Sequence, residues 1–111
     1  MNQIAMSSAA SALLRALIAR SGAPRNRILL TQVKSIDWQS LTFTGERHQI
    51  RLRIPGPESS AIVERICSEL EDAEFSIPGV IVADITSLGE HCGGPDGSIS
   101  LEIEALTVSE D

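Results

Sequence analysis

The sequence predicts an α+β domain in which a five-stranded, antiparallel-rich sheet carries two helices on one face. Three observations lead to this prediction. Two segments space their apolar residues by three and four, other short segments alternate apolar and polar residues, and glycine or proline separates the segments. A chain of 111 residues can bury one hydrophobic core but not two. We therefore expect a single domain over residues 1–111, a two-layer sandwich with the order α-β-β-β-α-β-β.

The first helix is expected to run from Ser7 or Ser8 to Arg20. Gly22 supplies a left-handed C-cap, and Pro24 prevents the helix from continuing. The apolar residues that recur on one side of this helix are Met6, Ala10, Leu13, Leu14, Leu17 and Ile18.

Three strands are expected next, over residues 27–36, 40–44 and 47–54, where β-branched and apolar residues gather. Gly45 and Glu46 would form a two-residue turn of type II′ between the second and third strands.

That turn fixes which residues face each other, and it divides the two strands into an apolar and a polar face. Phe43 would lie opposite His48, and Leu41 opposite Ile50. Because side chains alternate along a strand, the apolar face would hold Leu41, Phe43, Ile50, Leu52 and Ile54, and the polar face Gln49, Arg51 and Arg53.

The second half of the chain is expected to hold one helix and two strands. Residues 58–73 form the helix, with Ile62, Ile66, Leu70 and Ala73 on its apolar stripe. Residues 80–86 are apolar on both faces, so this strand is central or covered. After a loop over residues 88–97, residues 98–108 alternate clearly until Leu106 and Val108, which indicates a bulge or the end of pairing there.

A right-handed crossover through the second helix would leave a gap in the sheet that the last strand fills. The expected sheet order is 27–36, 40–44, 47–54, 98–105, 80–86. This layout resembles a circularly permuted ferredoxin-like plait, in which the N-terminal helix and strand replace the pair normally found at the C terminus.

The chain also resembles the soluble domains of the inner-membrane assembly platforms of type IV pili and type II secretion. The stretches that carry the resemblance are LLRALIARSGAPRNRILLTQVKSIDWQSLTFTGE, AIVERICSELEDAEFSIPGV and SLEIEAL. Those domains are not enzymes, and they pair with copies of themselves or with sister subunits. The resemblance therefore implies a role in protein interaction.

The charged residues are unevenly distributed along the chain. Residues 1–53 hold eight basic and two acidic residues, whereas residues 54–111 hold thirteen acidic and one basic. The formal charge of -6 argues against nucleic acid as a partner. No apolar run is long enough to insert into a membrane as a helix, and no secretory signal is visible, so we expect a cytoplasmic protein.

Five residues are candidates for a protein interface, namely Trp38, Arg51, Arg53, Val80 and Val82. The two arginines would meet phosphate or, more simply, pair with Glu102 and Glu104 across the sheet. The two valines would point to the same outer face and leave an apolar strip beside these charges. A homodimer would cover this strip, although the N-terminus or the C-terminal tail could shield it equally well. Trp38 would anchor a partner or lie at the edge of the core.

No set of residues predicts catalysis, a metal site or a cofactor. His91 and Cys92 lie near Glu90 and Asp96, but adjacent residues seldom bind one ion and the spacing fits no common zinc pattern. His48 is expected to be a partly buried structural residue. We therefore expect a non-enzymatic interaction or assembly module that self-associates through its sheet face. The alternative is a small-ligand sensor with a pocket between sheet and helices.

Overall fold

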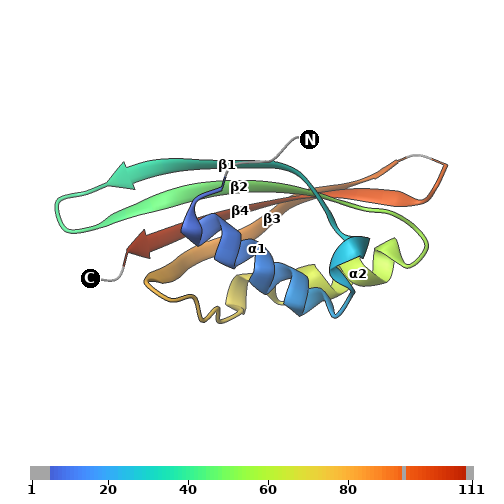
Figure 1. Cartoon of the computed structure of the whole chain (residues 1–111), viewed down its shortest axis with the longest axis horizontal. Helices are drawn as coiled ribbons and strands as arrows, with labels where there is room; N and C mark the ends of the chain where they lie inside the picture. The colour runs from blue at the N-terminus through green and yellow to red at the C-terminus, as the bar shows by residue number, and fades with distance from the viewer. Residues whose placement is uncertain (1–5, 94, 110–111) are drawn as a thin grey trace.

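The structure is a computed structural model that describes residues 6–93 and 95–109. One helical layer packs against one sheet, and Figure 1 shows both α-helices on the same side of the strands. In chain order the elements are α1 (Ser8–Ser21), the short 3₁₀ helix η1 (Arg25–Arg27), β1 (Leu29–Gln39), β2 (Thr44–Ile54), α2 (Ser59–Cys67), the 3₁₀ helix η2 (Leu70–Asp72), β3 (Val80–Gly93) and β4 (Ser98–Ser109). The predicted α+β class is confirmed.

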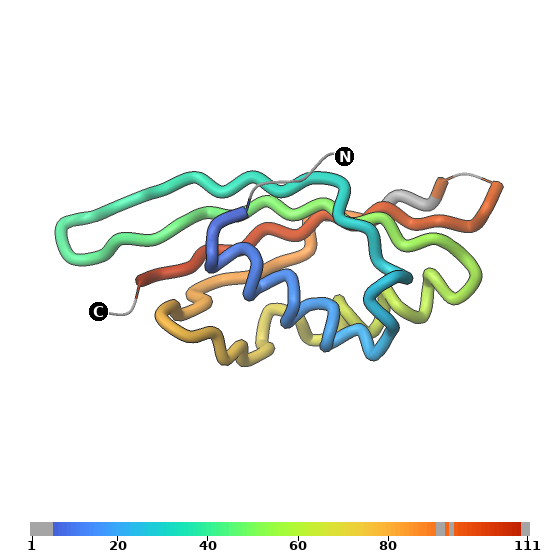
Figure 2. The backbone as a smooth tube through the Cα atoms, viewed as in Figure 1, coloured from blue at the N-terminus to red at the C-terminus, as the bar shows by residue number. Residues whose placement is uncertain are grey.

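The sheet has four antiparallel strands in the order β1-β2-β4-β3. The last strand therefore lies between β2 and β3, as predicted, and α2 connects these two strands on one face. Figure 2 shows the long β1–β2 hairpin extending past the start of α1 at its turn end.

The prediction of five strands is wrong, because residues 40–54 do not contain a turn at Gly45 and Glu46. Both residues lie inside β2, where Gly45 pairs with Trp38. The turn instead spans residues 40–43. There the Ser40 amide donates to the Phe43 carbonyl at 2.8 Å, and the Phe43 amide donates to the Ser40 hydroxyl at 3.1 Å. The Ser40 side chain therefore stabilises the turn by accepting a backbone hydrogen bond. The sequence prediction looked for a glycine at the turn and missed this serine.

Moving the turn changes the place of two apolar residues. Leu41 and Phe43 were expected on the core face, but they lie at the turn and are fully and about half exposed, respectively. Gly45 has a different role from the predicted one. A Cβ at this position would lie 1.9 Å from the Thr107 carbonyl oxygen and 3.1 Å from the Trp38 ring, so a close approach of backbones requires the glycine.

The core lies between the helices and the inward side chains of β2 and β4. These inward residues are Ile50, Leu52, Ile54, Ile99, Leu101 and Ile103, and they meet Leu13 and Leu17 of α1 and Ile62 and Ile66 of α2. Burying each large aliphatic side chain contributes about 1.5–3 kcal/mol. The predicted division into apolar and polar faces is confirmed for residues 49–54, because Gln49, Arg51 and Arg53 are exposed.

Helix α1 begins and ends as the sequence predicts. The Ser7 hydroxyl accepts a hydrogen bond from the Ala10 amide at 3.1 Å, and Gly22 adopts the left-handed conformation at φ 68°. Helix α2 ends earlier than predicted, at Cys67, because Glu69 has a left-handed backbone (φ 52°) that an α-helix cannot accommodate. Leu70 is nevertheless buried, as the apolar stripe predicted, because η2 resumes the helical path.

The two α-helices hold each other at their C-terminal ends. Arg20 of α1 donates to the Ile66 carbonyl at 3.0 Å and to the Ser68 carbonyl. In return Arg65 of α2 donates to the Ser21 carbonyl. Each guanidinium thereby satisfies carbonyls that the other helix leaves unpaired. Both arginines therefore tie the two helices together.

Candidate functional site

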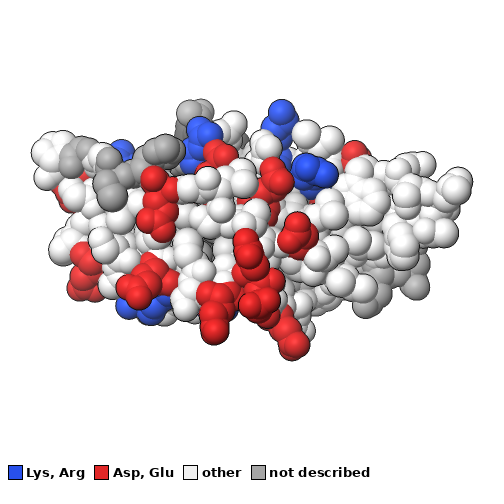
Figure 3. Space-filling model, turned by 180° about the vertical axis from the view of Figure 1, so that it is seen from behind, with Lys and Arg blue, Asp and Glu red and all other residues white. Residues whose placement is uncertain are grey.

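The face of the sheet that points away from the helices, here called the outer face, is polar and open. Its side chains come from alternate positions of the strands, with arginines on β2 beside glutamates on β4. Figure 3 shows the molecule from the side opposite to the view of Figure 1. Acidic side chains gather over the middle and lower part of that view, whereas its right-hand end, where the β1–β2 turn lies, is uncharged.

Three ion pairs cross this face. Arg51 donates through Nε and Nη2 to Oε1 of Glu102 at 3.1 and 2.6 Å. Nη1 of Arg47 lies 3.9 Å from Oε1 of Glu104, and Nη2 of Arg53 lies 3.2 Å from Oδ2 of Asp96; the part of the chain that the structure describes contains these three ion pairs. Basic residues of the first half of the chain thus pair with acidic residues of the second half, which resolves part of the charge asymmetry within the fold.

The predicted pair between Arg51 and Glu102 is confirmed, and the predicted partner of Arg53 is wrong. In an antiparallel pair, moving two residues forward on one strand means moving two residues back on the other. Arg53 therefore lies opposite Ser100, and Gln49 lies opposite Glu104. Arg53 reaches Asp96, in the turn between β3 and β4, instead.

Asp96 organises that turn. Its Oδ1 accepts a hydrogen bond from the Ser98 amide at 3.1 Å. Hydrogen bonds from Ser98 are the main cause that lowers the pKa of the Asp96 carboxyl, and the charge of Arg53 lowers it further. The carboxylate is therefore a structural acceptor in a turn.

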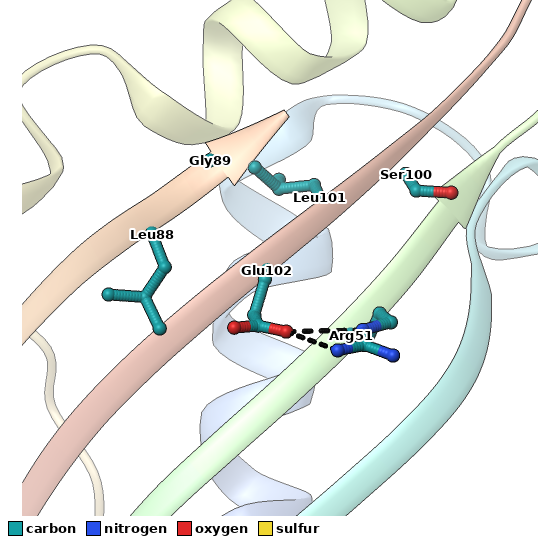
Figure 4. Close-up of a pocket in the computed structure, with 6 residues that line it drawn as sticks. All are labelled: Arg51, Leu88, Gly89, Ser100, Leu101 and Glu102. Carbon is teal, nitrogen blue, oxygen red and sulfur yellow. Dashed lines mark hydrogen bonds and ion pairs between the residues drawn. The ribbon is translucent and has the colours of Figure 1, made fainter. Parts of the chain in front are cut away.

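A shallow hollow of about 390 Å³ lies on the outer face beside the shortest ion pair, that of Arg51 and Glu102. Figure 4 shows Leu88 of β3, Glu102 of β4 and Arg51 of β2 around it, with Gly89 leaving space on β3; Ser100 and Leu101 complete the lining. The Arg51 guanidinium is already bound to Glu102 in the same wall, so an incoming phosphate would have to displace a carboxylate. Among the side chains that the structure describes, the lining offers one hydroxyl and no histidine to activate it.

The sequence pattern placed Val80 and Val82 on the outer face, and this prediction is wrong. Both are partly buried and pack against the core, whereas Ile81 is 51% exposed. The cause is a register shift between Val82 and Asp84, where β3 carries one residue more than β4 opposite it. The extra residue reverses the alternation, so the valines and Ile85 reach the same core.

Trp38 lies within β1 and not at a turn. The side chain is partly buried beside Gly45, and its ring occupies the space that a side chain at that position would need. Its indole nitrogen is buried. Among the buried side-chain nitrogen and oxygen atoms of the described residues, it is the one without a hydrogen-bond partner. The indole is therefore positioned by close packing at the uncharged end of the sheet.

A buried polar group lies on the opposite face and was not predicted as a unit. His48 is fully buried, and its Nδ1 and Nε2 lie 2.7 Å from the Ser35 hydroxyl and 2.9 Å from the Thr107 hydroxyl. Burial lowers the pKa of His48, and the nearby Glu46 raises it by a smaller amount. The sequence signal that could have predicted this group is the occurrence of a polar residue at an inward position on each of three neighbouring strands. Because the His48 ring is buried and both of its nitrogens lie within hydrogen-bond distance of a hydroxyl, His48 packs as a hydrogen-bonded core residue, more deeply buried than expected.

The remaining chemical candidates also have places in the fold. His91 and Cys92 belong by backbone to β3, which continues to Gly93 through the region predicted as a loop; their side chains lie outside what is described. Within the described part of the chain, no three potential metal ligands come together. Cys67 ends α2 with a partly buried thiol, and burial raises the pKa of this group.

None of the helices in the described residues is long and apolar enough to cross a membrane. No protein-family model, curated protein or solved structure matches this chain.

Proposed function

We propose that this chain is a non-enzymatic protein-interaction module that self-associates through the uncovered side of its sheet. The observation that carries the proposal is the outer face itself. Both α-helices cover the other face, and in the described residues no element covers this one. An antiparallel sheet can leave one face in water, and an exposed apolar patch on such a face commonly marks a contact with another chain.

Apolar side chains near the turn end of the outer face supply the apolar component of such a contact, and Arg47 lies between two of them. We define this apolar end by Ile36, Ile81, Leu106 and Val108. The two isoleucines are 49% and 51% exposed, and the other two side chains are partly buried. Register places Leu106 opposite Arg47 and Val108 opposite Ile81, so apolar residues border the ladder of ion pairs. An apolar patch with a charged rim is the usual composition of an interface.

The topology supports a more specific reading. With four strands, the order α-β-β-α-β-β and the sheet order β1-β2-β4-β3 fit a circularly permuted ferredoxin-like plait better than five strands would. We propose that layout for this chain. The resemblance to soluble domains of pilus and secretion assembly platforms would then extend to the role in which those domains pair with copies of themselves.

The test is the mass of the protein in solution as a function of concentration. Light scattering or sedimentation equilibrium up to ~1 mM should show a shift from one chain to two, because interfaces of modest size give dissociation constants in the micromolar to millimolar range. A protein that stays monomeric over the whole range would contradict the proposal.

One observation favours a second candidate function, a small-ligand sensor. A hollow of about 510 Å³ lies between α1 and β1, and most of its lining is apolar, including Leu14, Ile18, Ile28 and Leu30. A ligand bound there would stabilise the folded chain. Thermal-shift screening against a metabolite library should then raise the melting temperature with one chemical class of compound, and a flat screen would exclude this candidate.

A further inference from the structure

The two outer strands of the sheet, β1 and β3, differ in how open their edges are. Strand β1 pairs only with β2, and strand β3 pairs only with β4. The other edge of each strand therefore has no strand beside it in the described residues. Such an edge presents free backbone donors and acceptors and can add another strand.

The β3 edge is guarded. Two register shifts, between Val82 and Asp84 and between Ser87 and Gly89, divide it into short stretches. In addition η2 packs against β3, and the Glu71 carboxylate accepts a hydrogen bond from the Thr86 hydroxyl at 2.7 Å. Bulges and a covering segment are two of the devices by which proteins prevent pairing at an edge.

The β1 edge lacks these guards over most of its length. Its register shift lies near its start, between Leu30 and Gln32, and pairing with β2 then runs without interruption from Gln32 to Gln39. This stretch contains no proline or glycine and carries Ile36, which is 49% exposed, near its middle. A long regular edge with an exposed isoleucine is suited to strand addition.

We infer that β1 pairs antiparallel with β1 of a second copy, so that two sheets join into one of eight strands. This inference rests on the proposed self-association and places the contact at one edge of the sheet, beside the open face, instead of on the face itself. The partner is a second copy because an antiparallel pair of identical strands is self-complementary about a two-fold axis.

Charge and apolar character fix the position of the axis. With the axis through Ile36, this residue lies opposite its own copy and Lys34 lies opposite the partner's Trp38. An apolar pair and a cation beside an aromatic ring are both favourable cross-strand contacts. With the axis through Ser35, Ile36 would instead face the charge of the partner's Lys34. A lysine on an edge strand commonly prevents pairing with another chain. In the first register Lys34 is instead accommodated, because it contacts the Trp38 ring of the second copy.

The experiment compares two matched isoleucines on opposite edges, Ile36 of β1 and Ile81 of β3, which are 49% and 51% exposed. In a Cys67→Ser, Cys92→Ser background, Ile36→Cys should form a disulfide-linked dimer under mild oxidation, because directly opposed residues lie within disulfide reach. Ile81→Cys should stay monomeric on the same non-reducing gel. Circular dichroism checks that both variants are folded.

A second measurement avoids dependence on the cysteine variants. Ile36→Lys should raise the dimer Kd by at least about tenfold, because it places two like charges opposite each other at the axis, and Ile81→Lys should change it less than about twofold. A dimer that tolerates Ile36→Lys but not Ile81→Lys would overturn the edge inference and leave the proposed self-association standing. A wild-type protein that is monomeric at every concentration would overturn both.

Discussion

Strand β2 has two sides with opposite environments. Its inward residues His48, Ile50 and Leu52 are at most 1% exposed, whereas the side chains of Arg47 and Arg51, on the other side, are 57% and 52% exposed. The inward side holds the helices to the sheet, so its residues are fixed by packing. Apart from Gly45, the outward side can change without loss of the fold, and it is therefore where a function of this chain can reside.

The largest expected effect comes from removing inward volume. Leu52→Ala deletes a fully buried side chain at the centre of the core and should lower the free energy of unfolding by about 2–5 kcal/mol. The neighbouring change Arg53→Ala removes an exposed ion pair and should cost less than about 1 kcal/mol. Urea denaturation measures both. Similar losses in the two variants would contradict the division of the strand into a packed and a free side.

An intermediate effect is expected from the buried histidine, and it depends on pH. The pKa of His48 is lowered in the folded chain, while the unfolded chain has the ordinary value of about 6.5. Below that pH the unfolded chain gains a proton that the folded chain does not, so stability is complete above about pH 6.5 and falls as the pH drops. The slope should be at most about 1.4 kcal/mol per pH unit.

The comparison for this effect is His48→Gln, which can form hydrogen bonds but does not titrate. Urea denaturation between about pH 8 and pH 5 should show a shallower loss of stability in the variant than in the wild type. Equal slopes in the two proteins would show that His48 does not titrate differently on folding.

The sequence was a good guide wherever regular periodicity met a clear stop signal. Helix α1 ends at the predicted Gly22 cap, and residues 49–54 alternate as predicted. The signal failed where one residue decides the local geometry. Gly45 has the composition of a turn but serves a close backbone approach inside β2, and the extra residue after Val82 reverses the faces of β3. Neither a contact across strands nor a bulge has a signature within its own strand.

The candidate site divides in the same way. The pair of Arg51 and Glu102 followed from alternation and strand order, because both are local regularities. The difference between the guarded β3 edge and the open β1 edge did not, since it depends on where the register shifts lie and on Glu71 reaching Thr86 from η2. The sequence did not predict the hydrogen-bonded group of His48, Ser35 and Thr107, because the group depends on the register of three strands.

The smallest expected effect is the coupling within the ladder of ion pairs, and it sharpens the claim that the outward side is free. A double-mutant cycle of Arg51→Ala and Glu102→Ala should give a coupling of about 0.2–1 kcal/mol, since both side chains are partly exposed and screened by water. The cycle of Arg47→Ala and Glu104→Ala, whose charged atoms are 3.9 Å apart, should give a smaller value. Both couplings should shrink in ~1 M salt, because screening acts on exposed charges. A coupling well above 1 kcal/mol that survives salt would mean that the ladder helps to determine the fold, and the outward side of β2 would then be less free to serve an interface than we propose.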